Sequence, residues 1–220
     1  MGLEPIKKAI TLKEQAYLSI KQAIYSNTLQ PGAPLVEEQL SSTLSISRTP
    51  IRSALQQLVY EKLAFADNTG HIYVSKITEK DIEDITIIRS NLEPLVIDLV
   101  TFPLPKDTIT NLYDSYHKQL ELFENEPDNN IRYAELDCEF HTLLANLSNN
   151  TLLVEMIEKM NNMMIRFNVL SGTLNSHKKN ALEEHRMIIH YLETGKHEFA
   201  KAAILEHVKC VAQRIFSEEN

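Results

Sequence analysis

Glycine is scarce in this chain, and the spacing of its glycines excludes several kinds of site. The 220 residues contain five glycines, at positions 2, 32, 70, 172 and 195. They are too far apart to form a phosphate-binding G-x-G-x-x-G or Walker loop, or the G-x-S-x-G turn of a serine hydrolase. The sequence therefore gives no support to nucleotide-cofactor or nucleophile-elbow chemistry. Four of the glycines instead mark breaks between predicted elements.

Cysteines and long apolar runs are also rare. The two cysteines, Cys138 and Cys210, lie in predicted helical, apolar surroundings, so we expect reduced thiols in a cytosolic protein. The N-terminus has no apolar signal core. No apolar run approaches the roughly 18 residues that span a membrane. These absences predict a cytoplasmic protein with no membrane partner.

Acidic charge is concentrated in the later part of the chain. Residues 1–76 hold 8 Lys and Arg against 6 Asp and Glu, whereas residues 77–220 hold 14 against 24. The first segment is therefore +2 and the second −10, which together give the net charge of −8. We interpret the chain as two modules, 1–76 and 77–220. If the first binds DNA, its affinity must come from a few placed cations and not from a general positive field.

The first module has the element order of a winged helix-turn-helix. Its apolar pattern predicts an amphipathic helix over 11–28, with Leu12 on its buried stripe, and a Pro-Gly turn over 30–34. Two short helices, 35–44 and 47–58, follow around a turn at Ser45-Ile46, and helical spacing predicts that Ile51, Leu55 and Leu58 face inward. Strands over 63–66 and 71–75 flank the hairpin signal Asp67-Asn-Thr-Gly70. Three helices and a hairpin over roughly 11–76 predict a domain that places its third helix in the major groove of DNA.

The start of that third helix carries side chains suited to duplex DNA. Arg48 and Arg52 lie four residues apart and share a helix face, and each can pair with guanine or hold phosphate. Ser47 and Thr49 offer hydroxyls where backbone N–H groups also suit phosphate. The alternative is that Ser47 only caps the helix and the arginines are solvated.

The tip of the hairpin is a second candidate contact with DNA. Gly70 and His71 lie there, and we expect them to reach the minor groove or the backbone beside the recognition helix.

The second module is predicted to be all α. Proline and glycine breaks separate six helices, at roughly 78–101, 106–125, 129–147, 150–171, 177–194 and 197–217. Thr78 is a good N-cap for the first of them, with Asp81 in its first turn. No strand pattern follows residue 76. About 140 residues form a bundle large enough to enclose a pocket, and the chain as a whole is mainly α.

Four polar residues fall on apolar stripes of that bundle. Asp137 and His141 lie four apart on one helix, and His185 and His207 lie on two others. Burying unpaired carboxylate and imidazole groups is costly, and a divalent metal with one oxygen and three nitrogen ligands would remove that cost. Satisfied core histidines and an ordinary Asp–His hydrogen bond are the alternatives.

The first module resembles the GntR family of bacterial transcription regulators. The matching motifs are Gln30-Pro-Gly, Leu35-Val-Glu-Glu-Gln-Leu, Ser47-Arg-Thr-Pro-Ile-Arg-Ser-Ala-Leu and the Gly70 wing. The resemblance implies operator contact by Arg48, Thr49 and Arg52, with Gly70 and His71 at the wing. Family members often carry a basic residue in the preceding helix, whereas this chain has Glu37, Glu38 and Gln39.

The second module resembles the effector-binding (FCD) domain of the FadR-type subfamily, with the six helices of its VanR-like branch. The matching motifs are Tyr133-Ala-Glu-Leu-Asp-Cys-Glu-Phe-His141, Leu182-Glu-Glu-His185 and Glu206-His207. The resemblance implies a metal, commonly zinc, nickel or manganese, at the four polar positions. Arg89, within Ile88-Arg-Ser-Asn-Leu-Glu93, would clasp a ligand carboxylate unless it is a surface arginine. Arg166 is a further candidate cation for the pocket.

These features together predict a one-component transcription regulator and not an enzyme. We expect a homodimer, because one recognition helix reads too few bases. A small organic acid would act as effector, and the resemblance favours repression released by ligand. The alternatives are a regulator for which the metal ion is itself the signal, and a metal-dependent hydrolase or oxygenase. The enzyme interpretation lacks a general base on a loop and gives the winged helix no purpose.

Overall fold

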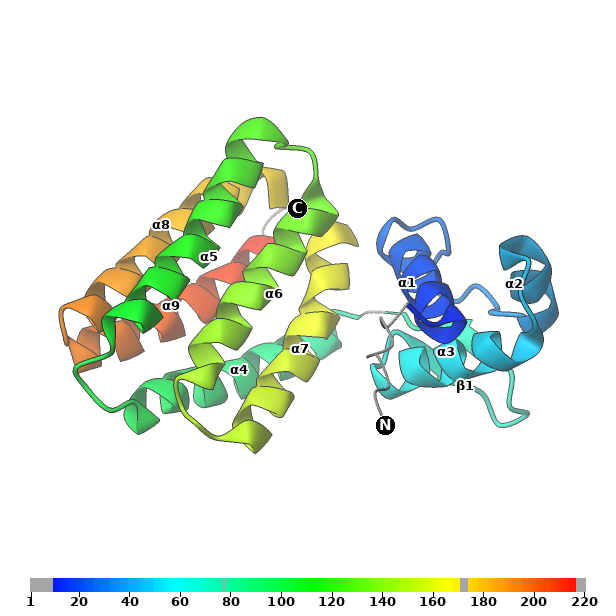
Figure 1. The fold of residues 1–220 in the computed structure, drawn as a ribbon, viewed down its shortest axis with the longest axis horizontal. Coiled ribbons are helices and arrows are strands. Elements are labelled where there is room, and N and C mark those ends of the chain that lie inside the picture. Colours follow the sequence, from blue (N-terminus) through cyan, green and yellow to red (C-terminus); the bar gives the residue numbers. More distant parts are fainter. Residues whose placement is uncertain (1–9, 77, 171–173, 217–220) are drawn as a thin grey trace, which may run out of the picture. The chain divides into compact units, whose positions relative to one another are not determined.

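The chain forms two compact units in the computed structural model, Met1–Lys76 and Ile77–Asn220. The structure describes residues 10–76, 78–170 and 174–216 (Figure 1). The predicted fold class is confirmed: a winged helix-turn-helix is followed by a bundle of helices.

The first unit contains three helices and a hairpin, namely α1 (Leu12–Tyr25), α2 (Glu37–Leu44), α3 (Arg48–Tyr60), β1 (Ala64–Ala66) and β2 (Ile72–Val74). The hydroxyl of Thr11 accepts a hydrogen bond from the backbone N–H of Glu14, which caps α1. Ser45 ends α2 in the left-handed conformation, at φ 54°. This residue forms the turn that separates α2 from the recognition helix α3.

The core of the first unit lies between α1 and α3. Ile51, Leu55 and Leu58 are completely buried, as their spacing predicts. The expectation that Leu12 lies on the buried stripe is wrong, because Leu12 is 53% exposed. It is the first residue of α1, ahead of the buried stripe that starts at Ala16.

A third stretch of backbone extends the hairpin. β1 and β2 pair antiparallel, with Ala64 opposite Val74. Beside β2, the N–H of Gly32 donates to the carbonyl of Val74 and that of Leu35 to Ile72. Sequence analysis assigned residues 30–34 to a turn, because prolines hide the extended pairing that follows it.

The second unit consists, over its described residues, of helices alone: α4 (Glu79–Leu99), α5 (Lys106–Asn125), α6 (Asn130–Asn146), α7 (Thr151–Leu170), α8 (Leu174–Glu193) and α9 (His197–Phe216). A reciprocal capping box joins Thr78 and Asp81 at the start of α4. α8 begins at Leu174, three residues before the predicted start. The predicted break at Gly172 lies outside the described residues.

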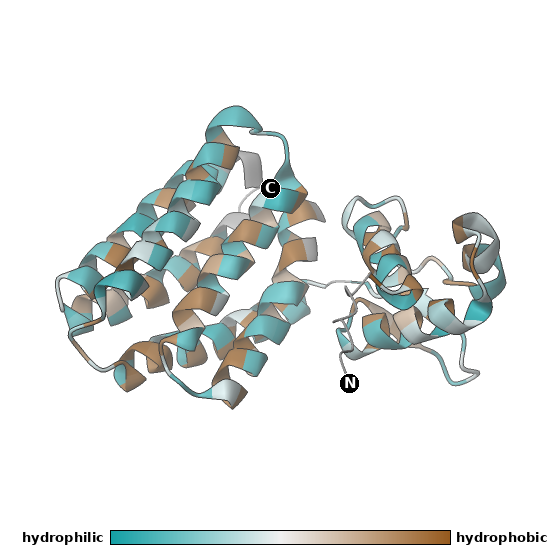
Figure 2. Cartoon of the chain, viewed as in Figure 1, coloured by the Kyte–Doolittle hydropathy of each residue, from teal (hydrophilic) through white to brown (hydrophobic). Residues whose placement is uncertain are grey.

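The six helices pack pairwise around a shared interior. α4 contacts α7 and α9, α5 contacts α6 and α8, α6 contacts α7, and α8 contacts α9. Along most of the helices, apolar residues alternate with polar ones as expected for amphipathic helices (Figure 2). Two apolar clusters form, one including Leu112, Phe140 and Ile189, the other Ile82, Val96 and Ile157. Within the described part of the chain, no helix is both long and apolar enough to cross a bilayer.

Candidate metal centre and nucleic-acid interface

The first turn of α3 presents its polar side chains to solvent. Ser47, Arg48, Thr49 and Arg52 are all exposed, whereas Ile51 between them is buried. Ser47 is the N-cap residue of α3, yet its hydroxyl makes no capping hydrogen bond. The alternative in which Ser47 serves only as a cap is therefore not supported by the geometry.

The two arginines of this turn contact two glutamates at the start of α2. Nη2 of Arg48 lies 2.7 Å from Oε1 of Glu38. Arg52 donates from Nε and from Nη2 to the two carboxylate oxygens of Glu37, each at 2.8 Å. The hydrogen bond from Arg52 lowers the pKa of Glu37 below its ordinary value. Sequence analysis identified both glutamates as unusual but did not pair them with the arginines, which are 10 and 15 residues away.

Asp67 organises the tip of the hairpin. One of its carboxylate oxygens accepts hydrogen bonds from the backbone N–H groups of Thr69 and His71, each at 2.9 Å. Gly70 has a φ of +85°, a backbone conformation that residues with a side chain rarely adopt. Gly70 and His71 are exposed at this tip, so the wing is held in shape by a residue that sequence analysis treated only as a turn signal.

The four candidate metal ligands meet inside the bundle. Asp137 and His141 come from α6, His185 from α8 and His207 from α9, and one potential ligand atom of each lies within 4.8 Å of the others. Nε2 of His207 lies 3.1 Å from Nε2 of His141 and 3.4 Å from Nε2 of His185. Oδ1 of Asp137 lies 3.5 Å from Nε2 of His185. The three imidazoles are buried.

Each imidazole has an oxygen acceptor beside its other nitrogen. Nδ1 of His185 lies 3.0 Å from Oε1 of Gln119, and Nδ1 of His207 lies 2.8 Å from Oε2 of Glu184. Nδ1 of His141 lies 2.8 Å from Oε2 of Glu93, although neither atom has a well-aligned hydrogen bond. A proton on Nδ1 leaves the Nε2 lone pair available, which is the arrangement typical of metal-binding histidines.

Three Nε2 lone pairs directed at one point repel each other unless a cation lies between them. Ligand nitrogens about 2.0–2.1 Å from zinc, at a tetrahedral angle, are roughly 3.4 Å apart. The observed Nε2 separations of 3.1 and 3.4 Å are close to that value. Glu184 requires the proton of His207 on Nδ1, so this ring has none to offer on Nε2. The residues present therefore fit a divalent metal with nitrogen and oxygen ligands.

Burial keeps two of these imidazoles neutral. It lowers the pKa of His185 well below 6.5, and repulsion from Arg89, and from His207 and His141 when these are protonated, lowers it further. Burial also lowers the pKa of His207, against the opposing effect of Glu184. Neutral imidazole is the form that binds metal, so the site is prepared for an ion at neutral pH.

Arg89 is buried beside the cluster and is not a surface arginine. It is 3% exposed and forms an ion pair through Nε with Glu93, one turn further along α4. Burial alone would raise the pKa of Glu93, but the charges of Arg89 and His141 outweigh this effect and hold it well below its ordinary value. Nη2 of Arg89 lies 3.5 Å from Nε2 of His141. The side chain of Arg166 lies outside the described part of the structure.

Sequence analysis missed the outer acceptors of the cluster. Glu93 and Glu184 stood inside the quoted motifs without an assigned role. Gln119 follows Leu112 and Tyr116 on the buried stripe of α5. The signal that identifies Gln119 is the same as that for the histidines: a polar residue on an apolar helical stripe.

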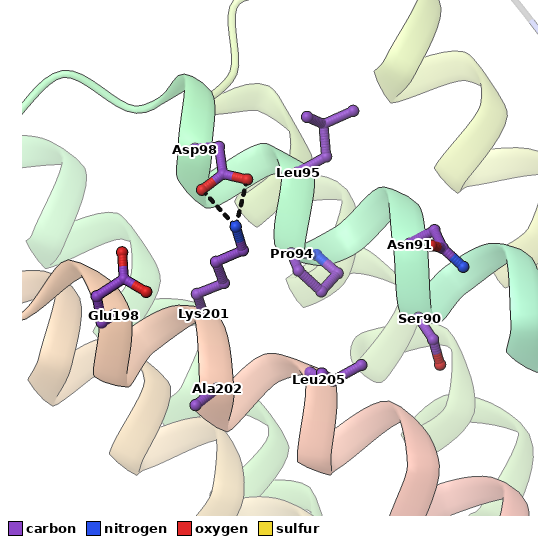
Figure 3. A pocket seen from close by; sticks show the side chains of 9 residues that line it. All are labelled: Ser90, Asn91, Pro94, Leu95, Asp98, Glu198, Lys201, Ala202 and Leu205. Atoms are coloured by element: carbon purple, nitrogen blue, oxygen red, sulfur yellow. Dashed lines mark hydrogen bonds and ion pairs between the residues drawn. The ribbon is translucent and has the colours of Figure 1, made fainter.

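A groove of about 440 Å³, separate from the histidine cluster, lies between α4 and α9 (Figure 3). Pro94, Leu95 and Leu205 are among its lining residues. The ammonium of Lys201 lies between the two carboxylate oxygens of Asp98, at 2.7 and 2.6 Å. None of the residues of the histidine cluster lines this groove.

Comparison with known proteins covers both units. The model of the bacterial regulatory proteins of the gntR family matches residues 12–74, and that of the FCD domain matches residues 84–209. YdhC of Bacillus subtilis, an HTH-type transcriptional regulator, is 32% identical across 88% of this chain and 86% of its own length. The HTH-type transcriptional repressor RspR of Escherichia coli is 23% identical across 93% of this chain and 89% of its own length.

Solved structures give the same fold. The E. coli protein McbR/YncC aligns with a TM-score of 0.79 at 20% identity, covering 96% of this chain and all of its own. A GntR-type regulator from Rhodococcus aligns with a TM-score of 0.80 at 19% identity, covering 94% and 99%. The FCD domain follows the helix-turn-helix along the chain. The chain therefore belongs to the GntR family and is a DNA-binding transcriptional regulator, not an enzyme.

Proposed function

We propose that this regulator is a homodimeric repressor whose FCD domain holds a divalent metal and responds to a small carboxylate. The metal ligands are Asp137, His141, His185 and His207. The DNA-reading residues are Ser47, Arg48, Thr49 and Arg52, with Gly70 and His71 at the wing. Repression is supported by RspR, a relative named as a repressor.

The observation that carries the metal proposal is the convergence of three Nε2 atoms whose rings have oxygen acceptors at Nδ1. Nitrogen and carboxylate donors suit zinc, nickel and manganese alike. When bound, the ion supplies positive charge and open coordination positions for a ligand oxygen. The residues of the chain orient the donors, and burial keeps His185 and His207 unprotonated.

Arg89 supports an anionic effector. Its Nη2 lies 3.5 Å from one proposed metal ligand, His141, so its guanidinium would add positive charge beside the ion. Glu93 occupies Nε of this guanidinium, and the remaining N–H groups can donate to a carboxylate. A small organic acid is the ligand class that a cation and a guanidinium recognise together.

The homodimer proposal is supported by an exposed apolar stripe on α4. Ile87, Ile88, Leu95 and Leu99 are between 40% and 61% exposed, and Leu95 also lines the groove beside α9. Several exposed, large apolar side chains on one helix are typical of an interaction surface. A second copy would also supply the second recognition helix that an operator of two half-sites requires.

Elemental analysis of the purified protein tests the metal proposal. Wild type should carry about one equivalent of a first-row metal per chain, whereas His141→Ala should lose most of it. Normal metal content in His141→Ala would contradict the four-ligand site. Metal that is hard to strip supports a cofactor role, while reversible micromolar binding that alters DNA affinity supports the ion as the signal. A thermal-shift screen of small organic acids with metal-loaded protein tests the effector, because a ligand of the folded state raises the melting temperature.

A further inference from the structure

The two carboxylates at the start of α2 hold the arginines of α3 in different ways. Glu37 accepts two hydrogen bonds from Arg52, and its side chain is 28% exposed. Glu38 makes a single contact with Arg48, and its side chain is 75% exposed. Arg52 is therefore fixed by a partly covered clamp, whereas Arg48 has one contact at the solvent-exposed surface.

The clamp leaves one particular end of the Arg52 side chain available. A guanidinium has five N–H groups in a planar fork. Glu37 takes one on Nε and one on Nη2, along one edge of the fork. Two of the three remaining N–H groups, one on Nη1 and one on Nη2, point in parallel from the end. Such a pair matches the O6 and N7 acceptors of guanine in the major groove.

The negative charge of Glu37 makes Arg52 less suited to binding phosphate and better suited to recognising a base. An arginine that holds phosphate needs its full positive charge and little orientation. An arginine that reads a base needs a fixed orientation, because ordering a long side chain on binding reduces affinity. Glu37 reduces the net charge at Arg52 and supplies its orientation, so the pair suits base reading.

We propose that Glu37 is a specificity-determining positioning residue, which presents the end of the Arg52 guanidinium to a guanine of the operator. The inference rests on the proposed role of Arg52 in reading DNA and adds a residue that does not itself touch the base. Glu38 has no such role, because its single exposed contact only reduces the charge near Arg48.

Isosteric amide variants of the full-length chain test this assignment. The probe is a duplex that the wild-type protein selects from a random-sequence library, with versions in which each G·C pair of a half-site is replaced by A·T. Fluorescence anisotropy at fixed salt gives the Kd for each duplex. Glu37→Gln and Glu38→Gln remove the same charge from adjacent positions, so Glu38→Gln is the matched control.

Both variants should bind duplexes that lack the guanine read by Arg52 somewhat more tightly, because each variant removes one negative charge from the DNA-facing side. Only Glu37→Gln should lose preference for one G·C pair, by about fivefold or more, as expected for a bidentate arginine–guanine contact. Glu37→Asp, which keeps the charge but shortens the reach, should lose the same preference. Equal preference in wild type, Glu37→Gln and Glu37→Asp would overturn the proposal.

Arg52→Ala separates failure of this inference from failure of the proposed DNA-reading set. If Arg52→Ala loses the preference while Glu37→Gln keeps it, Arg52 reads DNA without help from Glu37. If Arg52→Ala keeps the preference, Arg52 is not a base-reading residue and both assignments fail. The double variant Arg52→Ala/Glu37→Gln should have the same G·C preference as Arg52→Ala alone. A further loss of preference on adding Glu37→Gln would show that Glu37 does not act through Arg52.

Discussion

Nδ1 of His207 in α9 lies 2.8 Å from Oε2 of Glu184 in α8. Glu184 immediately precedes His185, so α8 supplies one proposed ligand and the orienting acceptor of another. Of these two adjacent side chains, His185 would therefore bind the candidate ion directly, and Glu184 would orient His207 toward it.

Glu184→Gln should weaken metal binding without removing a ligand. The amide oxygen can still accept a hydrogen bond from Nδ1 of His207. It no longer carries the negative charge that makes Nε2 of the imidazole a stronger metal ligand. Loss of such outer partners typically reduces metal affinity about 10- to 100-fold. Competition with a chelator of known affinity measures the change. Glu183→Gln, on an exposed neighbouring position of the same helix, is the control and should leave the affinity unchanged.

Arg89→Ala should destabilise the FCD unit as well as remove the proposed effector contact. The substitution leaves the Glu93 carboxylate buried without its guanidinium partner, and breaking a buried ion pair in this way costs about 3–5 kcal/mol. Urea denaturation should show most of this loss recovered in Arg89→Ala/Glu93→Gln. The double variant is the one in which to test the response to organic acids, and a preserved response there would rule out Arg89 as the carboxylate clasp.

The metal-free protein should lose stability as the pH falls from about 7 toward 5.5. The pKa values of His185 and His207 are lower in the folded state than the ordinary 6.5, so the unfolded chain binds more protons in this range. Stability is complete above 6.5 and falls by up to about 1.4 kcal/mol per pH unit for each imidazole that remains neutral. Glu93 does not contribute there, because its ordinary pKa is 4.5 and folding lowers it.

Chemical denaturation followed by circular dichroism at pH 7.5, 6.5 and 5.5 measures this slope. His185→Gln removes one of the titrating groups and should show a shallower loss. An identical slope in that variant would mean that the cluster does not determine the acid sensitivity.

Leu95→Glu should convert the proposed dimer into a monomer. The substitution places a charge on the exposed apolar stripe of α4, where the partner would have to bury it without compensation. Size-exclusion chromatography with light scattering measures the mass. Leu152→Glu is the matched control, since Leu152 is also an exposed leucine, at 59%, but lies on α7. A dimer that survives Leu95→Glu would place the interface elsewhere.

Regular features of the fold were predictable from the sequence. Helical spacing identified Ile51, Leu55 and Leu58 as core residues, and a Thr-x-x-Asp cap located the start of α4. The pairing of residues 32–35 with β2 was missed, because a segment with Pro31 and Pro34 has no strand pattern. Its hydrogen bonds depend on where the hairpin lies in space.

The candidate site was predictable in part, for a similar reason. Histidines on apolar stripes are rare enough to attract attention, and the three imidazoles do lie together with Asp137. Their outer acceptors, Glu93, Gln119 and Glu184, belong to common residue types whose role follows only from the facing helix. The contacts of Glu37 and Glu38 with the arginines likewise depend on how α2 crosses α3, which local sequence does not encode.

The histidine cluster draws on nearly every helix of the FCD unit. α6, α8 and α9 supply the proposed ligands, while α4 and α5 supply Glu93 and Gln119. Metal–ligand bonds tolerate changes of only about 0.2 Å. Displacement of α6, α8 or α9 by the length of a single covalent bond would therefore change the coordination of the ion, whereas displacement of α4 or α5 would remove an acceptor that orients a ligand. An effector that shifts the ion would shift the three ligand-bearing helices together.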